Sequence, residues 1–162
     1  MDAHPETGRP ETHDERVDRN LTELLAELRV ALPGVQVLLA FLLVVPFNQG
    51  FQKVSGFEKN LYLFTLLTTA VATILLIAPT VHHRLYFRQQ DKEFLVVSAN
   101  RLMLAGLGVL AVAIVAAMAL VTNYLFDSAG AVAASVGVGA VFLLVWLVIP
   151  LARRRQRVRT SE

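Results

Sequence analysis

Four long apolar segments constrain this chain more than any other feature. They cover about residues 33–47, 61–81, 102–121 and 129–151, and none of them contains Asp, Glu, Lys, Arg or His. A helix of about 20 apolar residues can cross the hydrocarbon core of a bilayer, and the first segment, which is short, needs the preceding turn to complete it. The sequence therefore predicts an all-α membrane protein with four transmembrane helices in two successive hairpins.

The composition supports one small membrane domain. Of the 162 residues, 55% are hydrophobic and 17% are charged. The chain has no cysteine, which excludes disulfides, thiolate metal sites and cysteine nucleophiles. The first 29 residues carry four arginines against eight acidic side chains, the opposite of the positively charged start of a secretory signal.

The residues before the first apolar segment divide into two parts. Residues 1–11 have little apolar content, so we expect disorder there. A T-x-x-E capping box begins at Thr12 and predicts a helix start. Residues 12–32 then predict a separate amphipathic helix, on the membrane surface or against cytoplasmic loops, which Pro33 ends or kinks. Its apolar stripe consists of Val17, Leu21, Leu24, Leu25, Leu28 and Leu32.

The basic residues indicate an orientation. If the N-terminal segment, the segment between the second and third spans and the tail at 152–162 share one side, that side holds 13 of the 15 Lys and Arg residues. Only Lys53 and Lys59 remain on the other side. The positive-inside rule then predicts a multi-pass protein of the cell membrane with both termini in the cytoplasm. Because the basic tail directly follows a span, we expect it to bind anionic lipid head groups and not nucleic acid.

The spans contain one series of polar side chains. Thr65, Thr69 and Thr73 recur every four residues and so share a helical face, and Gln36 lies in the first span. One interpretation is a polar seam for an ion or small solute. The other is that each hydroxyl bonds the carbonyl four residues before it, while Gln36 bonds a neighbouring helix. The depths of Gln36 and Thr73 agree, which predicts that they face each other or the same polar pocket.

Small residues are frequent in the third and fourth spans. They let helices approach closely in lipid, where packing drives association. We expect them to pack helices within one chain, with a homo-oligomer contact as the alternative. They are Gly106, Ala113, Ala117, Gly130, Ala133, Ala134, Gly137 and Ala140.

The predicted cytoplasmic face carries the remaining candidate residues. We expect the amphipathic helix to dock on the inner ends of the spans, with a carboxylate–arginine pair and buried leucines. The alternative buries the leucines in lipid and leaves the arginines to phospholipid head groups. The candidate residues are Glu23, Glu27, His83, Arg84, Arg88 and Lys92.

Sites for catalysis, metals or cofactors are not expected. His82 and His83 are consecutive, so on a helix they diverge by about 100° and do not share a metal. The sequence lacks a glycine-rich phosphate loop, a nucleophile elbow and paired carboxylates at catalytic spacing. We therefore expect no enzyme and no cofactor.

Three segments carry a resemblance that covers almost the whole chain apart from its ends. They are DERVDRNLTELLAEL at 14–28, RVALPGVQVLLAFLLVVPF at 29–47 and APTVHHRLYFRQQDK at 78–92. With them the chain resembles a family of uncharacterised bacterial four-span membrane proteins, some of them labelled sodium:proton antiporters. The resemblance implies membrane transport but identifies no catalytic residue to carry over.

Two functions follow from these observations. The first is a non-enzymatic membrane protein whose cytoplasmic face binds lipid or a protein partner. The alternative is a small oligomeric cation transporter or channel, sodium:proton antiporter-like, with the threonine series as its path. Ion-coupled transporters usually need an ionisable side chain within the membrane, and these spans have none, which favours the first.

Overall fold

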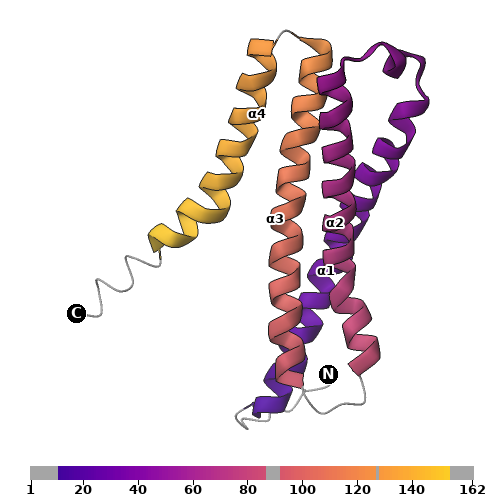
Figure 1. Ribbon diagram of the computed structural model, residues 1–162. Helices are drawn as coiled ribbons and strands as arrows, with labels where there is room; N and C mark the ends of the chain where they lie inside the picture. The colour runs from indigo at the N-terminus through magenta and orange to yellow at the C-terminus, as the bar shows by residue number, and fades with distance from the viewer. Residues whose placement is uncertain (1–10, 87–91, 127, 154–162) are drawn as a thin grey trace, which may run out of the picture.

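The structure is a computed structural model that describes residues 11–86, 92–126 and 128–153. It contains four long helices, α1 (His13–Val44), α2 (Gly56–Tyr86), α3 (Lys92–Leu125) and α4 (Ser128–Leu143), and a π-helical segment, η3 (Leu144–Val148), continues α4. Four helices are long and apolar enough to cross a membrane, which agrees with the predicted number of spans. We call the end of the bundle where α1 and α3 begin and α2 ends the lower end, as in Figure 1, and the opposite end the upper end.

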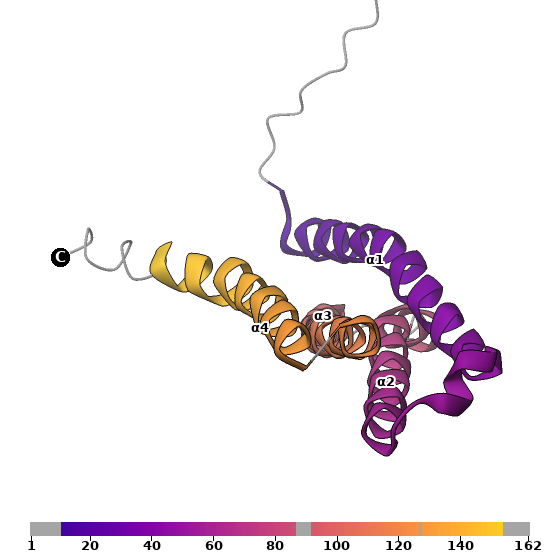
Figure 2. The same ribbon diagram turned by 90° about the horizontal axis from the view of Figure 1, so that it is seen from above.

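The prediction of a separate amphipathic helix is wrong, because α1 is one helix that continues through Pro33. Pro33 is exposed, while Leu28 and Val35 on either side of it are buried against the other helices, so packing holds both halves in one helix. Figure 2 shows α1 changing direction along its length, as a proline within a helix causes. The predicted capping box is confirmed, since Thr12 and Glu15 each accept the other's backbone N–H.

The predicted grouping of the helices into two hairpins is not supported. The most extensive contact joins α2 and α3, α1 contacts both of them, and α4 contacts α3 alone among the described helices (Figure 1). Small residues explain why the contact between α2 and α3 is so extensive. Ala72 of α2 and Ala99 and Ala113 of α3 are buried, and their short side chains let helix backbones approach closely. At Gly106 of α3 an added Cβ would lie 2.9 Å from Leu76 Cγ of α2, so only glycine fits.

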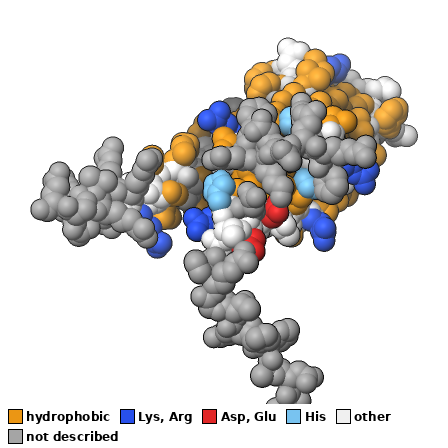
Figure 3. Space-filling view, turned by 90° about the horizontal axis from the view of Figure 1, so that it is seen from below, with side chains coloured by type: hydrophobic (Ala, Val, Ile, Leu, Met, Phe, Trp, Pro, Cys, Tyr) orange, Lys and Arg blue, Asp and Glu red, His pale blue; other side chains and the backbone are white. Residues whose placement is uncertain are grey.

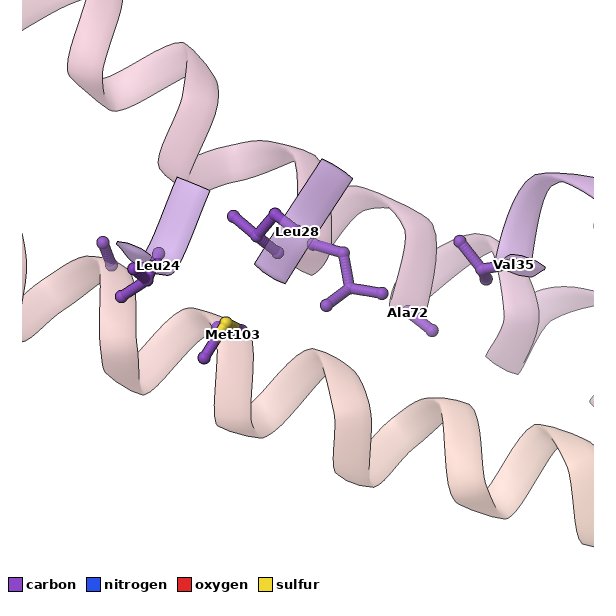
Figure 4. Packing of buried hydrophobic residues seen from close by; sticks show 7 residues of the cluster. Leu24, Leu28, Val35, Ala72 and Met103 are labelled. Atoms are coloured by element: carbon purple, nitrogen blue, oxygen red, sulfur yellow. The ribbon is translucent and has the colours of Figure 1, made fainter. Parts of the chain in front are cut away.

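The core lies in the lower half of the α1–α2–α3 bundle. Leu24 and Leu28 of α1 approach Met103 of α3, and Ala72 of α2 lies between Leu28 and Val35 in Figure 4. The buried residues of α1 include Leu21, Leu28, Val35 and Leu42, each seven residues after the last. A seven-residue period keeps one face of a helix turned to its partners, so the N-terminal stripe and the first span share one packing face.

The connection between α1 and α2 contains two 3₁₀ turns, η1 (Val45–Phe47) and η2 (Gln49–Lys53). Pro46 lacks an N–H, so the carbonyl of Leu42 loses the donor that the residue four positions later would supply. The hydroxyl of Tyr62 on α2 donates to this carbonyl at 3.0 Å, in a buried bond. The ring of Phe51 packs edge-on against Tyr62, with centroids 5.0 Å apart. Tyr62 therefore replaces a missing helical hydrogen bond and joins α1 to α2.

Replacing Tyr62 with phenylalanine should leave the Leu42 carbonyl without its donor. We expect Tyr62→Phe to lower the free energy of unfolding by about 0.6–1.7 kcal/mol, the range of polar contacts between membrane helices. The measurement is unfolding in mixed micelles followed by circular dichroism. Pro46→Ala offers the carbonyl a backbone N–H instead, so the loss should shrink in the Pro46→Ala background. Equal losses in both backgrounds would contradict this role of Tyr62.

Candidate functional site

The lower end extends beyond the thickness of a membrane. α1, α2 and α3 have 32, 31 and 34 residues, so each is about 46–51 Å long, against a hydrocarbon core of about 30 Å. The charged residues of these helices lie mostly at the lower end, and Figure 3 shows Lys, Arg and His side chains around an apolar surface there. This end is the candidate site.

Most of the apolar stripe at the start of α1 is buried, although it belongs to a continuous helix and not to a separate one. Val17, Leu21 and Leu24 of α1 are buried, and Leu28 is 1% exposed. Leu24 and Leu28 share the core cluster with Ala99 and Met103 in the first turns of α3. The N-terminal part of α1 therefore packs on other helices of the protein. The alternative, in which these leucines are buried in lipid, is wrong.

The predicted ion pair between α1 and α2 is not formed among the described residues. Glu23 accepts a hydrogen bond from Arg19 at 3.0 Å, on its own helix. Arg19 also reaches Glu11 at 3.0 Å, and Arg16 lies 3.6 Å from Glu11. Spacing of four residues places Arg19 and Glu23 on adjacent turns of one face, so the pair forms locally. The hydrogen bond from Arg19 holds the pKa of Glu11 below its usual value.

The other predicted residues of this face are distributed over α2 and α3. His83 is half-buried and Arg84 is exposed, both near the end of α2. Arg88 lies outside the described residues, and Lys92 begins α3, although its side chain is outside the description. Glu27 is exposed on α1. The structure thus brings Glu27, His83 and Arg84 toward the lower end.

Four arginines share a position in the fold, and only Arg84 among them belongs to the predicted interaction face. Each lies beside the lower end of one apolar stretch, is exposed, and forms no ion pair with a carboxylate in the described parts of the chain. The sequence alone could have identified them, because each is the arginine that borders one of the uncharged stretches at its lower end. They are Arg29, Arg84, Arg101 and Arg153, and we call them the boundary arginines.

The threonine series lies in the packing face of α2. Thr65 and Thr69 are fully buried and Thr73 is half-buried. Each hydroxyl donates to the carbonyl four residues earlier, at 2.7–2.8 Å, as the second interpretation predicted. Gln36 is exposed on α1, so the prediction that it faces Thr73 is wrong. Val35 occupies the buried face, and the next residue is turned away from it by about 100°.

A small cavity of about 210 Å³ lies at the upper end. Its lining includes Gly50, Glu58 and Tyr124. The Glu58 carboxylate accepts the backbone N–H of Ser55 at 2.7 Å, and Ser55 Oγ accepts that of Glu58. Glu58 therefore caps the start of α2, a structural role.

A larger apolar groove of about 490 Å³ lies between α3 on one side and α4 and η3 on the other. Gly108 and Val115 line it from α3, Phe142 and Gly139 from α4, and Trp146 from η3. The rings of Phe142 and Trp146 pack edge to face, with centroids 5.3 Å apart. No residue of α4 or η3 whose exposure is described is buried, so this span leaves the bundle as Figure 1 shows.

Within the described residues no group of three His, Asp or Glu side chains is placed to hold a metal ion.

Comparison with known proteins gives one match. No curated protein and no solved structure matches the chain. The model of a family of unknown function, DUF6328, matches residues 10–150. This match covers the four helices and most of the chain, and the protein therefore belongs to the DUF6328 family.

Proposed function

We propose that this is a non-enzymatic membrane protein that binds anionic lipid head groups at its lower end through the boundary arginines. The supporting observation is that every helix carries one exposed arginine beside its apolar stretch, and that none of the four pairs with a described carboxylate. Two acidic residues in and just before α1, Glu23 and Glu11, are instead engaged by Arg16 and Arg19.

Electrostatics gives this arrangement a binding energy. A Lys or Arg near an anionic membrane surface contributes about 1 kcal/mol, and the attraction falls off within a Debye length. The upper end offers only Lys53 and Lys59. We propose that the lower end faces the cytoplasm, where anionic lipid is enriched and where the excess of basic residues belongs.

The test is the lipid that stays with the purified protein. The protein is reconstituted in bilayers of phosphatidylglycerol and phosphatidylcholine, extracted in mild detergent, and analysed by native mass spectrometry. We expect bound phosphatidylglycerol to exceed its share of the bilayer about fivefold at low salt, since about 1 kcal/mol corresponds to that factor. Replacing all four boundary arginines with glutamine should abolish the enrichment.

A control variant separates position from net charge. Arg16→Gln, Arg19→Gln, Lys53→Gln and Lys59→Gln together remove the same charge from paired or upper-end positions. This variant should keep the enrichment. Equal losses in both variants, or no enrichment in the wild type, would refute the proposal. Cation flux into the same vesicles would instead favour the transporter alternative.

A further inference from the structure

The groove between α3 and α4 has an arginine below it on the same helical face. Val115, Gly108 and Arg101 of α3 are seven residues apart, so they lie almost directly above one another. Val115 and Gly108 line the groove, and Arg101 is exposed about 10 Å below Gly108. The groove is therefore an apolar surface that leads down to a cation.

We propose that this groove holds an acyl chain of an anionic phospholipid whose phosphate is bound by Arg101. The proposal rests on the function proposed above and assigns one site to it. The groove lining is almost entirely apolar and includes the rings of Phe64, Phe142 and Trp146. Along α3 it extends from Gly108 to Ala119, about 16 Å, close to half of a hydrocarbon core of about 30 Å. One acyl chain of a single leaflet has this length.

Charge favours lipid over a second copy of the protein. Copies in one membrane share an orientation, so a second α4 in the groove would bring its own Arg153 toward Arg101. Like charges at the edge of a low-dielectric region repel, whereas Arg101 attracts a phosphate. α4 also diverges from α3 toward its C-terminal end (Figure 1).

The sole tryptophan of the chain makes the groove observable. Trp146 lines the groove and is also partly exposed outside it, so the difference in its fluorescence between variants reports on what fills the groove. Lipids with brominated acyl chains quench tryptophan on contact. The full-length protein is reconstituted in vesicles in which either phosphatidylglycerol or phosphatidylcholine carries the bromine, and quenching is titrated for each.

We expect brominated phosphatidylglycerol to quench Trp146 at about one fifth of the concentration that brominated phosphatidylcholine needs, the factor that one arginine supplies. Arg101→Gln should remove this preference, while Lys59→Gln, at an exposed lysine of the upper end, should keep it. Gly108→Phe should reduce quenching by both lipids, because its ring enters the groove. Gly34→Phe, at a glycine of α1 with open space around it, should not.

Each contrary outcome has a distinct meaning. Equal quenching by both lipids in the wild type, while phosphatidylglycerol still copurifies in excess, would overturn this site and leave the proposed function standing. Loss of that excess as well would overturn both. Quenching by neither lipid, with disulfide-linked dimers of a Gly139→Cys variant, would show a second copy in the groove and refute the lipid site.

Discussion

Leu28→Ala is expected to cause the largest loss of stability of any single truncation in this protein. Leu28 is 1% exposed and lies in the core cluster with Ala72, Leu76 and Met103. Removing its three outer carbons leaves a cavity between three helices, and such changes cost about 2–5 kcal/mol. The small neighbours at this level have little side chain with which to fill the space, so the loss should lie in the upper part of that range.

The measurement is the free energy of unfolding in mixed micelles, with Val30→Ala as the control. Val30 is two residues away on the same helix and is 80% exposed, so its truncation should change stability little. If the N-terminal half of α1 lay on the membrane surface, the two variants would behave alike. Equal stability of Leu28→Ala and Val30→Ala would therefore contradict the docking of α1.

Gly106→Leu is the second substitution with a large expected effect. A Cβ at this position would stand 2.9 Å from both Cγ and Cδ2 of Leu76 and 3.2 Å from Leu75 Cβ. A leucine side chain must push α2 and α3 apart along their main contact, and overpacking of this kind costs about 1–3 kcal/mol. We expect a lower unfolding midpoint and weaker protection of amides in both helices from hydrogen exchange.

Gly108→Leu is the matched control, two residues along the same helix. Nothing lies within 4 Å of a Cβ placed there, and the residue faces the groove. Because leucine favours a helix by about 1 kcal/mol over glycine, this variant should be as stable as the wild type or slightly more so. A larger loss at Gly108 than at Gly106 would mean that α4 packs closely on α3.

The number of helices could be predicted from the sequence, because long uncharged segments leave few alternatives in a membrane. The continuity of α1 could also have been predicted. The seven-residue spacing of Leu21, Leu28 and Val35 continues unchanged across Pro33. A proline by itself, however, predicts that a helix ends or kinks. That rule reflects the cost of a lost hydrogen bond in an unsupported helix, and here packing on both sides of Pro33 offsets it.

The error at Gln36 has a different origin. The prediction compares the depth of Gln36 with that of Thr73, but depth says nothing about the direction of a side chain around the helix axis. Once Val35 is placed on the buried face, the helical period turns Gln36 outward. The threonine series was placed on one face correctly, and its hydroxyls bond their own backbone.

The position of α4 could not be predicted in this way. This span is apolar and rich in small residues on every side, so periodicity selects no face to pack. The groove follows from that uniformity, because α4 touches α3 without a buried side chain among those described. The boundary arginines were visible singly in the sequence, but their lack of carboxylate partners required the structure.

Because α4 lies outside the core cluster and is synthesised last, the other three helices can pack before it does. Every residue of the described core cluster belongs to α1, α2 or α3. All partners of the core cluster are therefore available once Leu125 has emerged from the ribosome, before α4 has emerged. A chain that ends at that point should already bury Leu28, Leu76 and Met103, and the last span enters the membrane beside a bundle that has finished folding.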